Sequence, residues 1–222
     1  MKDDIKTKGI VLRRTNYGEA DRILNIITPE GKISAIAKGV RKEKSRLAGG
    51  VEMMTLSEYN IHRGKSDMGV VTSAKMMRYY DKIVKDYNKM TLAGRILKKI
   101  NSASEGTAKE FFELAKESLE GLNSGVRPEV VEAWFDLNLL KCVGEEINLH
   151  RDERGELLVA TERYDWNRME KAFVISASGQ YGVNEIKLMR AMVSMGLIMV
   201  SRVKGIDEML PSVTQLIESV IK

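Results

Sequence analysis

The sequence predicts an α+β fold in which a small β-barrel is followed by an α-helical domain. Residues 1–80 contain short β-rich segments separated by turn residues, whereas apolar side chains after residue 80 recur at helical spacing. A chain of 222 residues is long enough for two modest domains, each with its own core. We therefore expect one domain over residues 1–80 and a second over residues 81–222.

Five segments of the first domain have the composition and alternation of strands. They cover residues 8–15, 21–28, 33–38, 51–62 and 68–77. Pro29 and Gly31 favour a turn between the second and third segments, because proline presets φ and glycine tolerates positive φ. Five short strands separated by glycine fit a small closed sheet, and the five-stranded oligonucleotide-binding (OB) barrel is one such structure.

Apolar side chains at helical spacing predict three helices between residues 83 and 140. The third helix begins at Pro128 and is apolar over a wide arc, so we expect it at the centre of a helical bundle. A last helix is expected from about residue 206 to residue 221. Proline is tolerated only in the first turn of a helix, so Pro211 is expected to lie there.

The segment 145–182 differs from the helices on either side of it. It is polar and punctuated by glycine, with short strand-like runs at residues 157–159 and 172–175. We interpret it as a small irregular or β excursion from the helical domain, held by the apolar side chains of Leu158, Phe173 and Ile175.

Charge is distributed unevenly along the chain. Residues 1–80 carry 16 Lys and Arg against 9 Asp and Glu, a net charge of +7, whereas residues 81–222 carry 20 against 22, a net charge of −2. A basic module on a near-neutral body is typical of polyanion binding, although a merely basic surface is the alternative. No apolar run reaches the ~20 residues of a membrane span, and the N-terminus lacks a signal peptide. We therefore expect a cytoplasmic protein without a membrane partner.

Side chains that could support catalysis or bind a metal are few. Cys142 is the only cysteine, which excludes an internal disulfide and a multi-cysteine zinc site. The two histidines, His62 and His150, have no neighbours that suggest a catalytic triad. A metal site formed by Cys142, His150 and Asp152 would need three scattered ligands, which is a weak signal. The sequence therefore predicts a protein that is not an enzyme and that has no cofactor.

Residues 38–50 (KGVRKEKSRLAGG) combine five cations with a single acid. They join two predicted strands, so we expect a mobile surface loop that can follow a phosphate chain without fixed register. Three cations of the first strand could extend the same patch. The candidate nucleic-acid-binding residues are Lys38, Arg41, Lys42, Lys44, Arg46, Arg13, Arg14 and Lys8.

Aromatic residues are scarce in the first domain, which has only Tyr17, Tyr59, Tyr79 and Tyr80. Because few rings are present to stack on bases, we expect contacts mainly with the phosphate backbone. Such contacts carry little sequence preference.

Several motifs of the chain resemble the RecO family of bacterial DNA repair proteins. They are YGEADR at residues 17–22, TPEGK at 28–32, AKGVR at 37–41, KSR at 44–46 and the helical sequence 128–140 that begins PEVV. The resemblance implies an OB barrel followed by a helical domain. It also implies a nucleoid-associated protein that binds single- and double-stranded DNA and anneals complementary strands. With RecR, such a protein promotes loading of RecA onto DNA coated by single-strand DNA-binding protein (SSB), whose acidic C-terminal tail it binds.

The resemblance matches Lys38, Arg41, Lys44 and Arg46 to the basic DNA-binding segment of the family. Many members also hold a four-cysteine zinc module in the helical domain. The corresponding residues 145–182 contain no cysteine, so zinc is not expected. The alternative to a DNA-binding mediator is an interaction scaffold that binds RecR or SSB and has little affinity for DNA.

Overall fold

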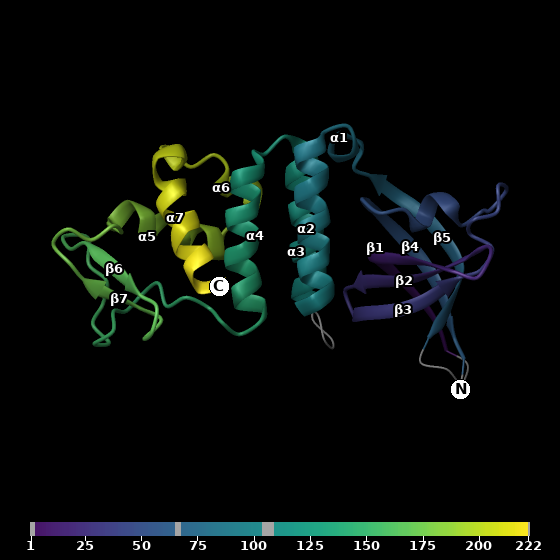
Figure 1. Ribbon diagram of the computed structural model, residues 1–222, viewed down its shortest axis with the longest axis horizontal. Helices are drawn as coiled ribbons and strands as arrows, with labels where there is room; N and C mark the ends of the chain where they lie inside the picture. The colour runs from purple at the N-terminus through teal and green to yellow at the C-terminus, as the bar shows by residue number, and fades with distance from the viewer. Residues whose placement is uncertain (1–2, 65–67, 104–108, 222) are drawn as a thin grey trace. The chain divides into compact units, whose positions relative to one another are not determined.

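The computed structural model describes residues 3–64, 68–103 and 109–221, and it divides the chain into two compact units (Figure 1). The first unit comprises Met1–Gly125 and the second Val126–Lys222. The change from strands to helices falls between Tyr79 and Asp81, next to the domain boundary expected at residue 80. The first compact unit nevertheless continues to Gly125, so its described residues contain three α-helices and a 3₁₀ helix in addition to the sheet.

Both units are built from short, regular elements. The first unit contains β1 (Asp3–Tyr17), β2 (Asp21–Thr28), β3 (Gly31–Ala37), the 3₁₀ helix η1 (Ala48–Val51), β4 (Thr55–Arg63), β5 (Gly69–Tyr79), α1 (Asp81–Val84), α2 (Tyr87–Ala103) and α3 (Lys109–Ser124). The second unit contains α4 (Pro128–Cys142), β6 (Tyr164–Asn167), β7 (Ala172–Ile175), α5 (Val183–Ser194), α6 (Leu197–Val200) and α7 (Ile206–Ile221).

The five strands of the first unit form a closed barrel in the order β1-β2-β3-β5-β4. Strand β1 pairs antiparallel with both β2 and β4, and the short parallel pairing of β3 with β5 completes the circuit. A register shift between Val11 and Arg13 lets the 15-residue β1 bend from one partner to the other. The predicted α+β fold with an N-terminal OB barrel and a helical remainder is therefore confirmed.

The barrel interior is filled by aliphatic side chains and one tyrosine. The interior cluster comprises Val11, Leu24, Ile26, Ile33, Ala35, Ala37, Val40, Val51, Tyr59, Ile61 and Val71. Two glycines leave the space that this packing needs. A Cβ at Gly9 would lie 2.5 Å from Cγ2 of Ile26, and a Cβ at Gly69 would lie 2.5 Å from Cγ2 of Ile61. The strands can approach this closely only because both positions lack a side chain.

Helices α2 and α3 pack against the outside of the barrel. Helix α2 contacts β1, and α3 contacts β1, β2 and β3. At the end of α2, Asn101 accepts hydrogen bonds from Asn25 Nδ2 on β2 (2.9 Å) and from Lys32 Nζ on β3 (2.9 Å). The helical hairpin therefore belongs structurally to the barrel, which explains why the first compact unit continues beyond residue 80.

The second unit is organised around α4, which contacts both α5 and α7. Val130, Val131, Trp134 and Phe135 of this helix are buried, so its predicted central place in a helical bundle agrees with the structure. Helix α7 spans the predicted residues, but Pro211 is its sixth residue and lies beyond the first turn. The expectation for Pro211 was therefore wrong, because burial of the opposite face of the helix compensates for the one backbone hydrogen bond that proline removes.

The excursion 145–182 contains the antiparallel hairpin of β6 and β7. The run at 172–175 is a strand as predicted, whereas 157–159 is not, and Tyr164–Asn167 supplies the partner strand instead. Rings of Tyr164, Trp166 and Tyr181 surround Phe173 edge-on at centroid distances of 5.1 to 6.2 Å. Phe173 is fully buried as expected, but Ile175 is half exposed, so aromatic packing holds the hairpin where aliphatic packing was expected.

Because Gly9 lies so close to Ile26, a methyl group added at Gly9 should lower the free energy of unfolding. The Gly9→Ala variant should unfold at a lower urea concentration, with a loss of about 1–3 kcal/mol, because the new Cβ overlaps Ile26. Gly94→Ala on α2 is the matched control, since no atom outside its own helix lies within 4 Å. It should stabilise the protein by about 0.5–1 kcal/mol through helix propensity. Equal stability of the two variants in urea unfolding followed by circular dichroism would contradict this account of barrel closure.

Candidate nucleic-acid interface

The segment between β3 and η1, residues 38–47, is termed the basic loop. The side chains of all five of its cations are exposed: Lys38, Arg41, Lys42, Lys44 and Arg46. Between them, Val40 is 3% exposed and belongs to the interior cluster of the barrel, and Leu47 packs partly against the same cluster. The apolar residues thus fix the loop to the barrel end while the cations remain in solvent.

Hydrogen bonds fix the backbone of the basic loop. Asp21 Oδ1 accepts a hydrogen bond from the Gly39 amide (2.7 Å), and the Ala20 carbonyl accepts one from the Arg41 amide (2.9 Å). Within the loop, the Lys42 amide donates to the Gly39 carbonyl at 3.1 Å. The sequence predicts a mobile loop, but the structure shows successive turns tied to the neighbouring strand. The cations are therefore presented on a preorganised backbone, which lowers the entropy lost on binding.

The turn between β1 and β2, residues 18–20, supports the basic loop from the side. Gly18 adopts a φ of 53°, in the left-handed region that favours glycine. Its carbonyl accepts a hydrogen bond from the Arg41 guanidinium (3.3 Å). The motif YGEADR thus supplies a tight turn and three acceptors for the loop. Asp21 is a supporting residue that charge counting does not reveal, although the motif contains it.

Arg14 is engaged in an ion-pair network at the barrel end. Its guanidinium pairs with Glu52, and Arg22 Nη1 lies 3.3 Å from the other oxygen of the same carboxylate. Arg22 also donates from Nε to Asn16 Oδ1 (3.3 Å). One carboxylate therefore offsets part of the charge of two arginines. Less of the Arg14 charge is free for a phosphate than the sequence suggests.

Arg13 and Lys8 are exposed on the outer side of β1, at different distances from the loop. Arg13 lies opposite Asn25, four residues before the end of β1. Lys8 lies opposite Glu58 of β4, nine residues before the end of β1, a strand length of about 30 Å. Arg13 is therefore nearer than Lys8 to the strand end at which the supporting turn of the basic loop begins.

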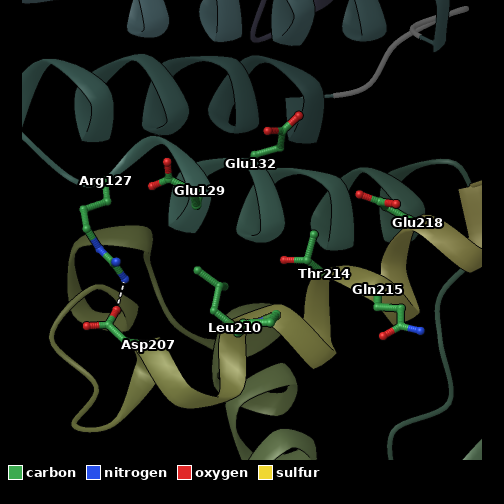
Figure 2. Close-up of a pocket in the computed structure, with 9 residues that line it drawn as sticks. Arg127, Glu129, Glu132, Asp207, Leu210, Thr214, Gln215 and Glu218 are labelled. Carbon is green, nitrogen blue, oxygen red and sulfur yellow. Dashed lines mark hydrogen bonds and ion pairs between the residues drawn. The ribbon is translucent and has the colours of Figure 1, made fainter.

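The second unit has an acidic groove of about 450 Å³ between α4 and α7 (Figure 2). Arg127 at one end is paired with Asp207, and the carboxylates of Glu129, Glu132 and Glu218 lie along the groove. Carboxylates at this density repel phosphate. We therefore do not place the nucleic-acid interface in this groove.

A second hollow, of about 470 Å³, lies between α5 and the start of α7. Its lining includes the charged side chains of Lys187, Lys204 and Glu208 and the apolar side chains of Leu188, Val203 and Met209. Two cations against one carboxylate, beside apolar side chains, suit an acidic peptide that ends in an apolar side chain.

Among residues 3–64, 68–103 and 109–221, no group of three or more His, Cys, Asp or Glu side chains is placed to hold a metal ion. This applies to the set Cys142, His150 and Asp152 considered from the sequence. In the same described ranges, no helix is long and apolar enough to cross a membrane.

The amino-acid sequence is similar to one protein-family model and to several curated proteins. Residues 1–80 match the family model described as "Recombination protein O N terminal". The chain is 35% identical over 144 residues to the DNA repair protein RecO of a Dehalococcoides mccartyi strain, covering 64% of this chain and 56% of the relative. It is 35% identical over 144 residues to RecO of Acetivibrio thermocellus, and 33% identical over 142 residues to RecO of Bacillus cytotoxicus. In both of these cases the match covers 63% of this chain and 57% of the relative.

The relatives carry the name DNA repair protein RecO, and the described structure combines an OB barrel with an exposed cationic loop. The chain is related to the RecO family, and residues 1–80 are a RecO-type N-terminal domain. The matched region spans a little over half of the length of the first relatives.

The hydrogen bond from the Gly39 amide to Asp21 leads to a prediction about the backbone of the basic loop. In Asp21→Ala, the Gly39 amide should exchange with solvent about tenfold faster or more, since a charge-assisted hydrogen bond worth about 1.5–3 kcal/mol is lost. Glu19→Ala, an exposed acid of the same turn, is the control and should leave the exchange rate unchanged. Hydrogen exchange measured by NMR tests this, and equal rates in the two variants would show that the loop is held by other contacts.

Proposed function

We propose that this protein is a DNA-binding recombination mediator that acts in repair without covalent chemistry. The observation that carries the proposal is the basic loop, whose five exposed cations lie on a backbone fixed to the end of an OB barrel. The relation to RecO supports DNA as the polyanion. On this proposal the protein works in the cytoplasm at the nucleoid, and it needs neither zinc nor another cofactor.

The mechanism follows from electrostatics. Lysine and arginine side chains that neutralise phosphates release condensed counterions, which favours binding to single- and double-stranded DNA alike. A protein that holds two strands at once raises their local concentration and screens their repulsion. Complementary strands then pair faster. This is the physical content of strand annealing, and no residue has to act as an acid, a base or a nucleophile.

The helices of the first unit influence where DNA can bind. OB folds commonly bind oligonucleotides across their second and third strands. Here α3 contacts β2 and β3, and Lys32 of β3 is hydrogen-bonded to Asn101 of α2. Part of that face is therefore occupied. We place the DNA instead at the barrel end, where Lys38, Arg41, Lys42, Lys44 and Arg46 are exposed beside Arg13 and Arg14.

We further propose that the second unit binds the acidic C-terminal tail of SSB. The hollow between α5 and α7 supports this, because Lys187 and Lys204 can pair with carboxylates beside apolar side chains of the same lining. Binding SSB and DNA together would recruit the protein to coated single strands. Action with RecR, and RecA loading as an indirect result, then complete the proposed role. The alternative is a scaffold that binds RecR or SSB and has little affinity for DNA.

The DNA interface is tested by a salt titration. Binding of fluorescent single-stranded DNA should weaken with salt, and each lost phosphate contact should reduce the slope of log K against log salt by about 0.7. The variant Arg41→Ala, Lys44→Ala, Arg46→Ala should therefore lower the magnitude of this slope by about 2. The matched control removes three exposed cations of the second unit, Lys141, Arg154 and Arg168, and should change the slope little.

Unchanged affinity and slope in the loop variant would remove the basic loop from the interface. Absence of DNA binding by the unaltered protein, even at low salt, would favour the interaction scaffold.

The SSB proposal has an independent test. Replacing both lysines that line the hollow, Lys187→Glu and Lys204→Glu, should weaken binding of a synthetic SSB C-terminal peptide by about tenfold or more, because attraction becomes repulsion. The control Lys141→Glu with Arg154→Glu makes the same change of net charge elsewhere in the second unit. Isothermal titration calorimetry measures both. Equal weakening in the two variants would mean that the peptide responds to net charge and not to this hollow.

A further inference from the structure

Tyr17 is the last residue of β1, and its side chain is 56% exposed. In the β1–β2 register it lies opposite Asp21, while Arg13 lies opposite Asn25. Residues two apart on a strand share a face, so Arg13 and Tyr17 point to the same side of β1. Within the described part of the chain, the Tyr17 ring makes no aromatic or cation–π contact.

The Tyr17 ring lies next to two of the hydrogen bonds that hold the basic loop. Directly opposite Tyr17, the Asp21 carboxylate binds the Gly39 amide, and side chains of opposing residues lie about 5 Å apart at Cβ. The following residue, Gly18, binds the Arg41 guanidinium through its carbonyl. The turn therefore holds an exposed aromatic face beside the cations at a fixed position.

The other tyrosines of the barrel do not offer such a face. Tyr59 and Tyr80 are fully buried, and burial raises the pKa of both hydroxyls far above the usual range. Tyr79 is 45% exposed, but its neighbour Arg78 forms an ion pair with Glu120. The cation next to the Tyr79 ring is therefore less available to a phosphate than the cations of the basic loop are.

We propose that the Tyr17 ring is a nucleobase-binding site, on which an unpaired base stacks while the flanking phosphates contact Arg13 on one side and Arg41 on the other. This inference rests on the proposed function, because it requires the DNA to lie at the basic loop. A base in a duplex is covered on both faces by its neighbours, whereas an unpaired base has a free π-face. The site therefore gives the interface a preference for single strands that phosphate contacts alone do not supply.

The test separates stacking from phosphate contact by using three probes: a fluorescent oligothymidylate, an abasic strand of the same length and a duplex. The Tyr17→Ala variant should bind oligothymidylate about tenfold more weakly, whereas its affinity for the abasic strand and the duplex should be unchanged. Tyr17→Phe should retain the affinity of the unaltered protein, because the ring is kept. Tyr87→Ala is the matched control, since Tyr87 is 76% exposed at the start of α2. It should bind all three probes normally.

Three results would overturn the base site while leaving DNA binding intact. They are unchanged affinity of Tyr17→Ala for oligothymidylate, an equal loss for the abasic strand, and an equal loss in Tyr87→Ala. Failure of the unaltered protein to bind any of the three probes would contradict the proposed function and the base site together. Because Tyr17 is exposed, its replacement should leave the circular dichroism spectrum and the urea midpoint unchanged, which confirms that the variants are folded.

Discussion

The pairing of β1 with two partners is the constraint on which the first unit depends. A sheet of five strands becomes a barrel only if one strand bends far enough to bond β2 along one part and β4 along the other. The register shift at Val11 provides the bend, and Gly9 provides the space beside Ile26. Closure satisfies the backbone groups that an open sheet would expose at its edges, so the barrel presents side chains and loops to its partners instead of strand edges.

Barrel closure also determines where the cations lie. Because β1 ends and β2 begins beside the exit from β3, the short turn after Tyr17 is adjacent to the start of the basic loop. Asp21, Ala20 and Gly18 can then hold the loop through one carboxylate and two carbonyls. A charge-rich segment that would repel itself in isolation is thus kept in one conformation by neutral and acidic groups of the neighbouring strand. The cations belong to residues 38–47, whereas the acceptor groups that hold the loop belong to residues 18–21.

Local features of the structure could be predicted, and those that depend on distant contacts could not. Alternation and turn residues indicate the strands, and helical periodicity indicates α4 and its central place. The pairing of Arg14 with Glu52 joins residues 38 positions apart, and the register of Lys8 opposite Glu58 depends on barrel closure. The packing of α2 on β1 is equally nonlocal, so the sequence suggests a division at residue 80 where the structure has one after Gly125. The loop cations can be read from the sequence of residues 38–47 alone. The fixed conformation of the loop backbone cannot, because it depends on hydrogen bonds to residues 20 and 21.

The connection order of the barrel has a consequence for the newly synthesised chain. Strand β1 leaves the ribosome first, but one of its two partners, β4, follows only after β2, β3 and η1. Contacts between segments so far apart form late, since a long loop must close before any of them is gained. Until β4 and β5 arrive, the hairpins of β1, β2 and β3 have an unpaired edge and exposed apolar side chains. A nascent chain of this protein therefore has to complete β4 and β5 before the interior cluster that buries Val40 of the basic loop can form.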